Sequence, residues 1–235
     1  MAEGTAEIVI ECTIEVVEKN MKEETKKKIT DFFKNYPLKK YKKGQLLYEP
    51  NENFGGISFL KSGYLRVYSV AKDGKETSVQ LFKPLFYFSL IEAKTGRKNP
   101  FYIEALTPIE MWTAPAKEFL KFLRTNDLLC EDVTNVFLSK FVDVTNYMVQ
   151  LVSGDAYTKV AALINSISEE YGVANGKKVS IKFKVTHKLI ASLTGLTRET
   201  VTLQMLKLEK DGLIDNDKRQ IVIQNSAKLK KLLGY

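Results

Sequence analysis

The spacing of apolar side chains changes near Pro115, and this change restricts the folds that the chain can adopt. In residues 38–112, short runs rich in β-branched and aromatic residues alternate with glycine and proline, as in strands joined by tight turns. Beyond Pro115, apolar residues instead recur at every third or fourth position, as on one face of a helix. We therefore expect a β-sandwich, barrel or roll followed by helices.

A long helix is expected over about residues 131–151. Its apolar stripe consists of Val133, Val136, Phe137, Val144, Tyr147, Met148 and Leu151. Some twenty helical residues extend over roughly 30 Å, which is more than a small β domain needs as a cover. The stripe packs either on the chain's own β domain or on the same helix of a second copy, and a second copy is the more economical partner.

The net positive charge of the chain comes entirely from its last quarter. The formal net charge is +8, and residues 177–235 carry 13 Lys and Arg against 5 Asp and Glu, so the rest of the chain is neutral. A basic module joined to a neutral one is typical of proteins with a polyanionic partner, because neutralising phosphates releases condensed counterions. A solvated basic surface is the alternative.

Composition argues against several other classes. Cys12 and Cys130 are far apart and form no CxxC pattern, so we expect free thiols rather than a zinc site, an iron–sulfur cluster or a disulfide framework. No apolar run is long enough to cross a bilayer, and the N-terminus lacks the pattern of a secretion signal. We expect a cytoplasmic protein with no membrane partner.

Residues 186–209 have the spacing of a helix-turn-helix. The sequence predicts a first helix over 186–193, a turn at Thr194-Gly195-Leu196, and a second helix over 197–209 with Thr197 as its N-cap. The apolar residues that would pack the two helices together are Leu189, Ile190, Leu193, Leu196, Val201, Met205 and Leu208.

Arg198, Glu199, Thr202 and Leu203 are left to face outward at the N-terminal end of the second helix, where major-groove readers place their base contacts. Arginine is the commonest bidentate partner of guanine, and a carboxylate accepts a hydrogen bond from cytosine N4. Because a carboxylate repels phosphates, base reading explains Glu199 better than backbone binding does. An exposed ion pair between Arg198 and Glu199 is the alternative, but the turn, the cap and the local charge favour DNA.

Segments on both sides of this motif complete the module. Before it, we expect a helix over 156–170 and a polar turn over 172–176. After Gly212, residues 213–223 read as two strands around a polar tip. These strands would form a β wing, with Lys218 and Arg219 at its tip in reach of the DNA backbone.

Two motifs in this module resemble the signature of Crp/Fnr-type transcription regulators: Gly195-Leu196-Thr197-Arg198-Glu199-Thr200-Val201 and Leu208-Glu209-Lys210-Asp211-Gly212-Leu213-Ile214. Residues 43–45, 57–63 and 73–76 resemble the β-roll of the same family, and the order of elements matches from about residue 21. The resemblance implies an α+β protein that is a homodimer and reads a pseudo-palindromic site on double-stranded DNA. RNA polymerase would be a further partner if the protein is an activator.

The resemblance also divides the chain. Residues 1–20 would be a lead that is either an edge strand or poorly ordered, and residues 21–125 an antiparallel β-roll of the jelly-roll type that senses an effector. Residues 126–153 would be the dimerisation helix and residues 154–235 the winged helix-turn-helix domain.

By position, the resemblance makes Arg198 and Glu199 base readers. His187, Thr197 and Thr200 match positions that contact phosphate in the cyclic-AMP-dependent members of the family. Leu203 stands where those members have a second base-reading arginine, and a leucine cannot bond guanine but can contact a thymine methyl. We therefore expect a half-site that differs from theirs.

The expected effector pocket departs further from the family. Cyclic-nucleotide binders of this fold carry Gly-Glu-Leu for ribose and Arg-Ser for phosphate, where this chain has Phe88-Ser89-Leu90 and Asn99-Pro100. A buried cyclic phosphate without its arginine would be an unpaired charge, so cyclic AMP is not expected. The residues that the resemblance places around the pocket are Phe86, Phe88, Ser89, Leu90, Asn99, Tyr102 and Thr145.

Aromatic residues crowd this region, and three readings stay open. The aromatic side chains could fill the interior of the roll completely, or they could line a pocket for a small apolar or aromatic effector. In the third reading the protein has no ligand at all. The only histidine, His187, lies in the basic module, so haem is not expected, and no other cofactor is.

Two other function classes fit less well. An enzyme is not expected, because one histidine leaves no Ser-His or Cys-His pair and no paired acid–base set stands out. A regulatory subunit with a cyclic-nucleotide-type domain that acts through protein contacts is the alternative function, but it would have no use for Arg198 and Glu199.

Overall fold

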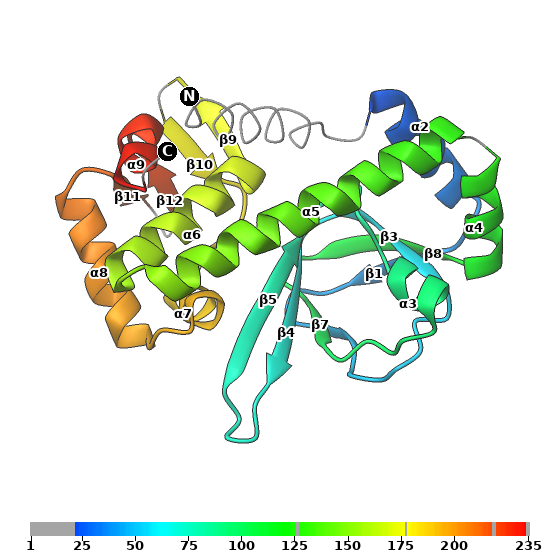
Figure 1. The fold of residues 1–235 in the computed structure, drawn as a ribbon, viewed down its shortest axis with the longest axis horizontal. Helices are drawn as coiled ribbons and strands as arrows, with labels where there is room; N and C mark the ends of the chain where they lie inside the picture. Colours follow the sequence, from blue (N-terminus) through cyan, green and yellow to red (C-terminus); the bar gives the residue numbers. More distant parts are fainter. Residues whose placement is uncertain (1–21, 126, 177, 218–219, 234–235) are drawn as a thin grey trace, which may run out of the picture.

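The computed structural model describes residues 22–125, 127–176, 178–217 and 220–233, and it confirms the α+β class. A β-rich body and a helix-rich body are joined by the long helix α5 (Asp127–Ser153), which runs from one to the other (Figure 1). None of the described helices combines the length and the apolar character that spanning a membrane would require. The predicted lead at 1–20 and the predicted backbone contacts Lys218 and Arg219 lie outside the described residues.

Two antiparallel four-stranded sheets form the β-rich body. The first has the order β1 (Leu38–Tyr41), β8 (Ile109–Ala114), β3 (Ile57–Ser62) and β6 (Tyr87–Phe88). The second has the order β2 (Leu46–Tyr48), β7 (Tyr102–Ala105), β4 (Leu65–Val70) and β5 (Glu76–Phe82). The core between the sheets includes Leu60 and Met111 from the first and Leu65, Val67 and Ile103 from the second. This is the β-roll that the sequence predicted.

Helices cover the outer face of the first sheet. Helix α2 (Glu23–Phe33), helix α4 (Ala116–Arg124) and the first half of α5 form one apolar cluster with this sheet. Phe33 of α2 stacks on Phe59 of β3, with ring centroids 4.9 Å apart. The short helix α3 (Leu90–Thr95) follows β6 and adds Leu90 to the same cluster. The first half of α5 is therefore part of the β-rich body.

The helix-rich body contains the predicted winged helix. Its helices are α6 (Ala156–Tyr171), α7 (His187–Thr194), α8 (Arg198–Lys210) and α9 (Ser226–Leu232). Its sheet has the order β11 (Ile214–Asp217), β12 (Gln220–Ile223), β10 (Lys178–Ile181) and β9 (Gly172–Asn175). Strands β11 and β12 are the two strands of the predicted wing.

The polar turn predicted over 172–176 is wrong, because most of this segment is strand β9, which pairs with β10 from Gly172 opposite Ile181 to Asn175 opposite Lys178. Glycine and asparagine have low β propensity. The ladder to β10 supplies the backbone hydrogen bonds that hold the segment extended.

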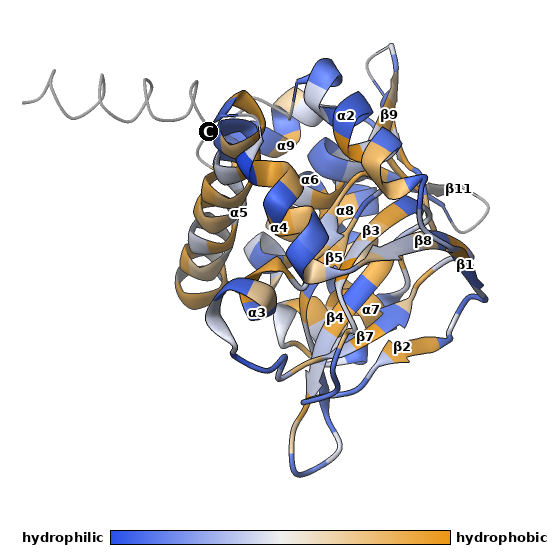
Figure 2. Cartoon of the chain, turned by 90° about the vertical axis from the view of Figure 1, so that its right-hand side faces the viewer, coloured by the Kyte–Doolittle hydropathy of each residue, from blue (hydrophilic) through white to orange (hydrophobic). Residues whose placement is uncertain are grey.

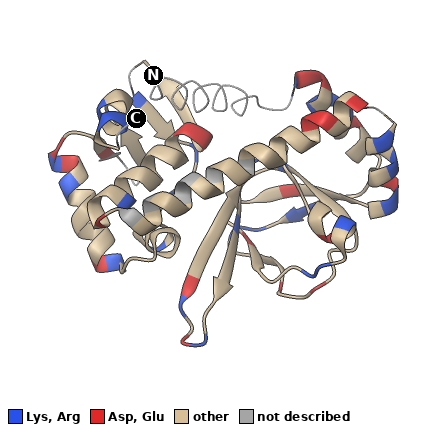
Figure 3. Ribbon diagram, in the orientation of Figure 1, with Lys and Arg blue, Asp and Glu red and all other residues tan. Residues whose placement is uncertain are grey.

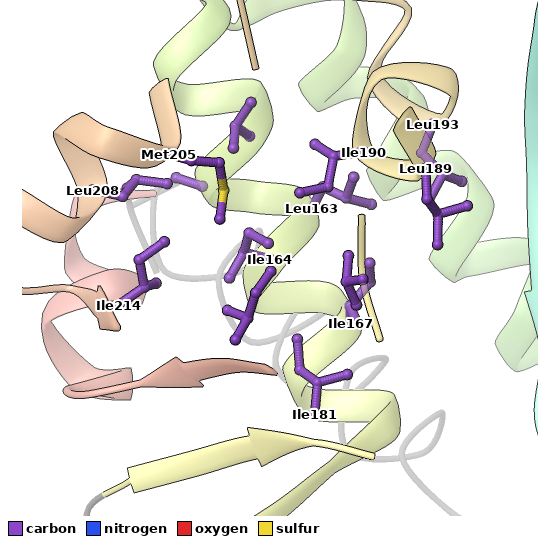
Figure 4. Packing of buried hydrophobic residues seen from close by; sticks show 14 of the residues in the cluster. Leu163, Ile164, Ile167, Ile181, Leu189, Ile190, Leu193, Met205, Leu208 and Ile214 are labelled. Atoms are coloured by element: carbon purple, nitrogen blue, oxygen red, sulfur yellow. The ribbon is translucent and has the colours of Figure 1, made fainter. Parts of the chain in front are cut away.

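One apolar cluster holds the helix-rich body together. Figure 4 shows Ile164 of α6 among Ile181 of β10, Ile190 of α7 and Met205 of α8, all of them buried. Side chains from three helices and the sheet thus share one core, and their packing fixes α8 relative to α6 and α7.

The helix-rich body docks on the outer face of the second sheet. Leu81 of β5 belongs to the apolar cluster of the helix-rich body, and the Tyr171 hydroxyl donates a hydrogen bond to the Leu81 carbonyl at 2.9 Å. Tyr64, between β3 and β4, packs on Phe183 with ring centroids 4.7 Å apart. Because α6, α7 and α8 form one packed unit, the β-rich body sets the direction in which α8 points.

Candidate nucleic-acid interface

Two hydroxyl caps and a glycine turn position α7 and α8. Thr186 Oγ1 accepts a hydrogen bond from Leu189 N at 3.1 Å, and Thr197 Oγ1 accepts one from Thr200 N at 3.1 Å. Between the helices, Gly195 has a φ of 73°, in the left-handed region that favours glycine. Each cap satisfies an N–H group at a helix start, so α8 begins at Arg198, directly after the predicted cap.

Helix α8 has one buried and one exposed face. Val201, Met205 and Leu208 are buried, whereas Arg198, Glu199 and Leu203 are exposed. The helix lies at the edge of the molecule (Figure 1), and charged residues mark both of its ends (Figure 3). An exposed helix start that carries arginine and glutamate side by side would suit contacts to base edges in a major groove.

Thr202, the fourth predicted base reader, is half-buried and already bonded. Its hydroxyl donates to the Arg198 carbonyl at 2.9 Å and lies 2.9 Å from His187 Nδ1. Because the hydroxyl proton points at the carbonyl, Nδ1 is the donor to Thr202 Oγ1. Because Nδ1 takes part in this bond, any contact of His187 with a phosphate would be made through Nε2.

The predicted phosphate contacts Thr197 and Thr200 lie together at the start of α8. Their hydroxyl oxygens are 2.9 Å apart, and Thr200 N donates to the Thr197 hydroxyl. The N-terminal end of a helix carries the positive end of its dipole, which favours a nearby anion. Both residues therefore lie where a phosphate would be stabilised.

A basic hollow of about 470 Å³ lies beside this helix start. Lys184, Lys188, Arg198 and His187 contribute to its wall, and Met205 is among its apolar lining residues. The sequence reasoning missed Lys184 and Lys188 as possible DNA contacts. Their position just before and just after the Thr186 cap is the signal that could have identified them, because it places both beside the first turn of α7.

Comparison with known proteins agrees with this arrangement. Residues 158–232 match the model of the Crp-like helix-turn-helix domain, and residues 38–126 match that of the cyclic nucleotide-binding domain. The chain is similar to the global nitrogen regulator of Nostoc sp. (strain PCC 7120), with 22% identity over 81% of this chain and 86% of the relative.

Two solved structures share the fold. A transcriptional regulator of the CRP/FNR family from Thermus thermophilus superimposes with a TM-score of 0.66 at 22% identity, over 85% of this chain and 99% of that one. FixK2 from Bradyrhizobium japonicum gives a TM-score of 0.71 at 19% identity, over 84% of this chain and 96% of that one. Together the two domain matches cover more than half of the chain, in the order that the family requires.

The chain belongs to the Crp/Fnr family of transcription regulators. Its helix-turn-helix therefore belongs to a DNA-binding domain, and α8 is the second helix of that motif.

In this Crp/Fnr regulator, the residues aligned with nucleotide-binding positions are bonded within the protein. Ser89 Oγ donates to the Gly56 carbonyl at 2.7 Å. Asn99 forms a closed turn with Phe101: its Nδ2 donates to the Phe101 carbonyl, and its Oδ1 accepts from Phe101 N at 3.2 Å. Leu90 is buried with the helices outside the first sheet. None of these three side chains presents a positive charge.

The structure does not bring all seven predicted pocket residues together. Phe88 is buried between the sheets, but Tyr102 stacks on Tyr68, with ring centroids 5.2 Å apart, on the opposite face of the second sheet. The prediction that Tyr102 and Phe88 line one pocket is therefore wrong, since neighbouring residues of a strand point to opposite faces and Ile103 takes the inner one. Phe86 lies beside Phe82, with centroids 4.4 Å apart, and Thr145 Oγ1 donates to the Phe141 carbonyl of its own helix.

The predicted dimer stripe of α5 divides into two halves. Val133, Val136 and Phe137 pack on the chain's own β-rich body, and the Tyr87 hydroxyl donates to the Val133 carbonyl at 3.3 Å. These three residues therefore pack within the chain, and their part in a dimer seam stays a prediction. In the second half, Val144 and Met148 are exposed and Leu151 is half-buried, while the side chain of Tyr147 is not among those described.

The outward face of α5 is nonetheless apolar. Hydrophobic residues follow α5 along the edge of the molecule (Figure 2). The large exposed apolar residues of its middle and C-terminal part are Leu138, Phe141, Val144, Met148, Val149 and Val152. Of these, the sequence reasoning did not include Leu138, Phe141, Val149 and Val152.

Proposed function

We propose that this Crp/Fnr regulator binds DNA as a homodimer, reads a pseudo-palindromic site through α8, and responds to a signal other than cyclic AMP. The observation that carries the proposal is the exposed pair Arg198 and Glu199 at the capped start of α8, next to a hollow lined by Lys184 and Lys188. Arginine and glutamate supply base contacts, and the lysines supply charge for the backbone.

The proposed dimer forms through the outward face of α5. Leu138, Phe141, Thr145, Met148 and Val152 follow each other at intervals of three, four, three and four residues, which is the heptad spacing of a two-stranded coiled coil. All five are exposed in the single chain. A second copy of α5 would cover this stripe and place two recognition helices in symmetric positions, so the bound site would be a pseudo-palindrome.

The proposal that cyclic AMP is not the effector rests on the bonding of Ser89 and Asn99. A cyclic phosphate is an anion that needs a charged donor when it is buried. Asn99 uses its amide on the Phe101 carbonyl, and Ser89 uses its hydroxyl on Gly56. A nucleotide at these positions would have to break both bonds and would gain no cation in return.

The alternative is a regulatory subunit that acts through protein contacts alone. Such a protein needs neither an exposed Arg-Glu pair on a capped helix nor lysines around the helix start. If the regulator activates transcription, RNA polymerase would be its protein partner in addition to DNA. We infer no catalytic role, in keeping with the regulators to which the chain is similar.

Selection of bound sequences from random double-stranded DNA tests the proposal. We expect a pseudo-palindrome whose half-site contains a guanine read by Arg198. Arg198→Ala should then reduce discrimination at that guanine by about 1–3 kcal/mol and leave the preference at other positions in place. Lys210→Ala, a charge removal at the far end of the same helix, is the control and should weaken binding to all sequences alike. Enrichment of no sequence would contradict the proposed function.

A further inference from the structure

Helix α8 exposes two leucines: Leu203, at a base-reading position of the family, and Leu206, which lies beyond those positions. Leu203 is 65% exposed and Leu206 is 57% exposed, although both lie on a helix whose neighbouring turns are charged. Large apolar side chains that remain in water on a binding surface usually have an apolar partner. We infer that Leu203 and Leu206 together read the methyl groups of two adjacent thymines in each half-site. This inference rests on the proposed DNA-binding function of α8.

Both leucines lie on the face of α8 that points away from the protein. At 100° per residue, Leu203 and Leu206 fall opposite Val201, Met205 and Leu208, the residues that α8 buries. Glu199 and Lys210 fall on the same outer line, one before the leucines and one after them. A helix that presents Glu199 to base edges therefore presents Leu203 and Leu206 to the same groove.

The spacing of the two leucines fits neighbouring base pairs. Three residues of helix advance by about 4.5 Å, and one base pair advances by about 3.4 Å along the DNA axis. A helix that crosses the groove at an angle therefore brings residues three apart to successive base pairs. Leu206 lies further along α8 than Arg198 and Glu199, so it extends the reading surface beyond the guanine.

Thymine is the base that suits these side chains. It is the only base with a methyl group in the major groove, and the other base edges there offer donors and acceptors that a leucine cannot satisfy. Burying such a polar edge against leucine would leave it unpaired at a cost.

The surroundings argue against a protein partner for the same face. A helix groove on a protein needs apolar anchors over several turns. On α8 the apolar surface ends after two side chains, because Lys207 and Lys210 follow. Lys207 Nζ lies over the Tyr157 ring at 4.3 Å, and Lys210 is exposed. Two leucines between charged residues match two methyl groups within a phosphate-lined groove.

Replacement of thymine by deoxyuridine tests the inference, since it removes one methyl group and changes no hydrogen-bonding atom. In the selected site we expect two adjacent A·T pairs in each half-site next to the guanine. Deoxyuridine at one of these thymines in one half-site should weaken binding about fourfold, the value for one buried methyl-sized group, and in both half-sites about fifteenfold.

Leu206→Ala should abolish the effect of deoxyuridine at one of the two thymines and keep it at the other, and Leu203→Ala should do the reverse. Val173→Ala is the control, because Val173 is an exposed apolar residue of the same body on strand β9 and should leave both effects unchanged. Both leucines are exposed, so loss of folding does not obscure the result.

The outcomes distinguish failure of the thymine-reading inference from failure of the proposed DNA-binding function. If a sequence is selected but deoxyuridine binds as well as thymine at every position, the thymine-reading inference is overturned while the proposed function stands. If Leu206→Ala changes the sedimentation coefficient and not the response to deoxyuridine, the leucines contact protein and the inference is also overturned. If no sequence is selected, the proposed function itself fails.

Discussion

Removal of Arg66 should weaken the join between the two bodies. Arg66 Nε donates to Ser78 Oγ at 2.6 Å, and Arg66 Nη1 lies 2.8 Å from Glu76 and 3.5 Å from Glu104. Ser78 Oγ in turn lies 2.7 Å from Ser192 Oγ on α7. One buried guanidinium therefore orders the Glu76 carboxylate and the Ser78 hydroxyl, which contact Lys188 and Ser192 of α7.

The expected loss of unfolding free energy follows from how deeply Arg66 and its two carboxylate partners are buried. Removing one partner of a fully buried ion pair costs ~3–5 kcal/mol, because the other charge stays buried and unpaired. The Arg66 side chain is 8% exposed, but the side chains of Glu76 and Glu104 are 30% and 26% exposed. Water reaches both carboxylates, so we expect Arg66→Ala to lower the free energy of unfolding by roughly 2–3 kcal/mol.

Urea unfolding followed by tryptophan fluorescence measures this effect, because the chain has one tryptophan, Trp112, and it is buried on β8. A loss of this size should move the midpoint by roughly 1 M urea. Lys40→Ala is the control: Lys40 also pairs with a carboxylate, Glu110, at 3.0 Å, but its side chain is 74% exposed, and the midpoint should not move. Equal midpoints for Arg66→Ala and the parent protein would refute the reasoning.

Three further results are expected. Phe141→Asp places a charge in the proposed dimer seam and should give a monomer at micromolar concentration in sedimentation, whereas Leu128→Asp, also exposed but outside the heptad positions, should leave the dimer intact. Calorimetric titration with cyclic AMP should give no heat of binding at micromolar concentrations, and a measured micromolar affinity would contradict the argument from Ser89 and Asn99. The docking of α7 should weaken in acid. Burial alone would raise the pKa of Glu76, but the hydrogen bond and charge of Arg66, together with Lys188, have the larger effect. The pKa of Glu76 therefore lies below its ordinary value of 4.5. The ionised group therefore stabilises the join above that value, and the stability is lost as the pH falls below it; hydrogen exchange of α7 should report the loss, and Glu76→Gln should remove the dependence on pH.

The helix-turn-helix was the most predictable part of the molecule, because its signals are local. A threonine cap three residues before the N–H that it satisfies defines the start of α8, and the left-handed Gly195 defines the end of α7. The sequence alone also predicts that Leu206 points outward, because a count of 100° per residue from Val201 places it on the opposite face of the helix. The family's base-reading positions end at Leu203, so the resemblance gave no reason to include Leu206.

The sequence could not divide the stripe of α5 between its two partners. Val133 and Phe137 are as apolar as Phe141 and Met148, and a single helix pattern does not say which turns pack on the β-rich body. That division depends on where the first sheet ends, which is set by long-range pairing of β3 with β6 and β8. Gly172–Asn175 became a strand for a different reason: it forms a local hairpin with β10, although its own propensity favoured a turn.

Strand β5 connects the aromatic interior of the roll to the DNA-binding body through neighbouring residues. Phe82 faces the interior, where its ring lies 4.4 Å from that of Phe86. Leu81, the residue before it, faces outward and is packed in the core of the helix-rich body. Phe86 also lies 6.4 Å from Phe137 of α5. Because protein interiors are close-packed and transmit strain, a rearrangement of the aromatic side chains that shifts β5 would displace Leu81 as well. The interior of the roll is thus linked to the body that carries α8 through Leu81, the neighbour of Phe82 on β5. It also contacts α5, the helix proposed to join two copies, through Phe86 and Phe137.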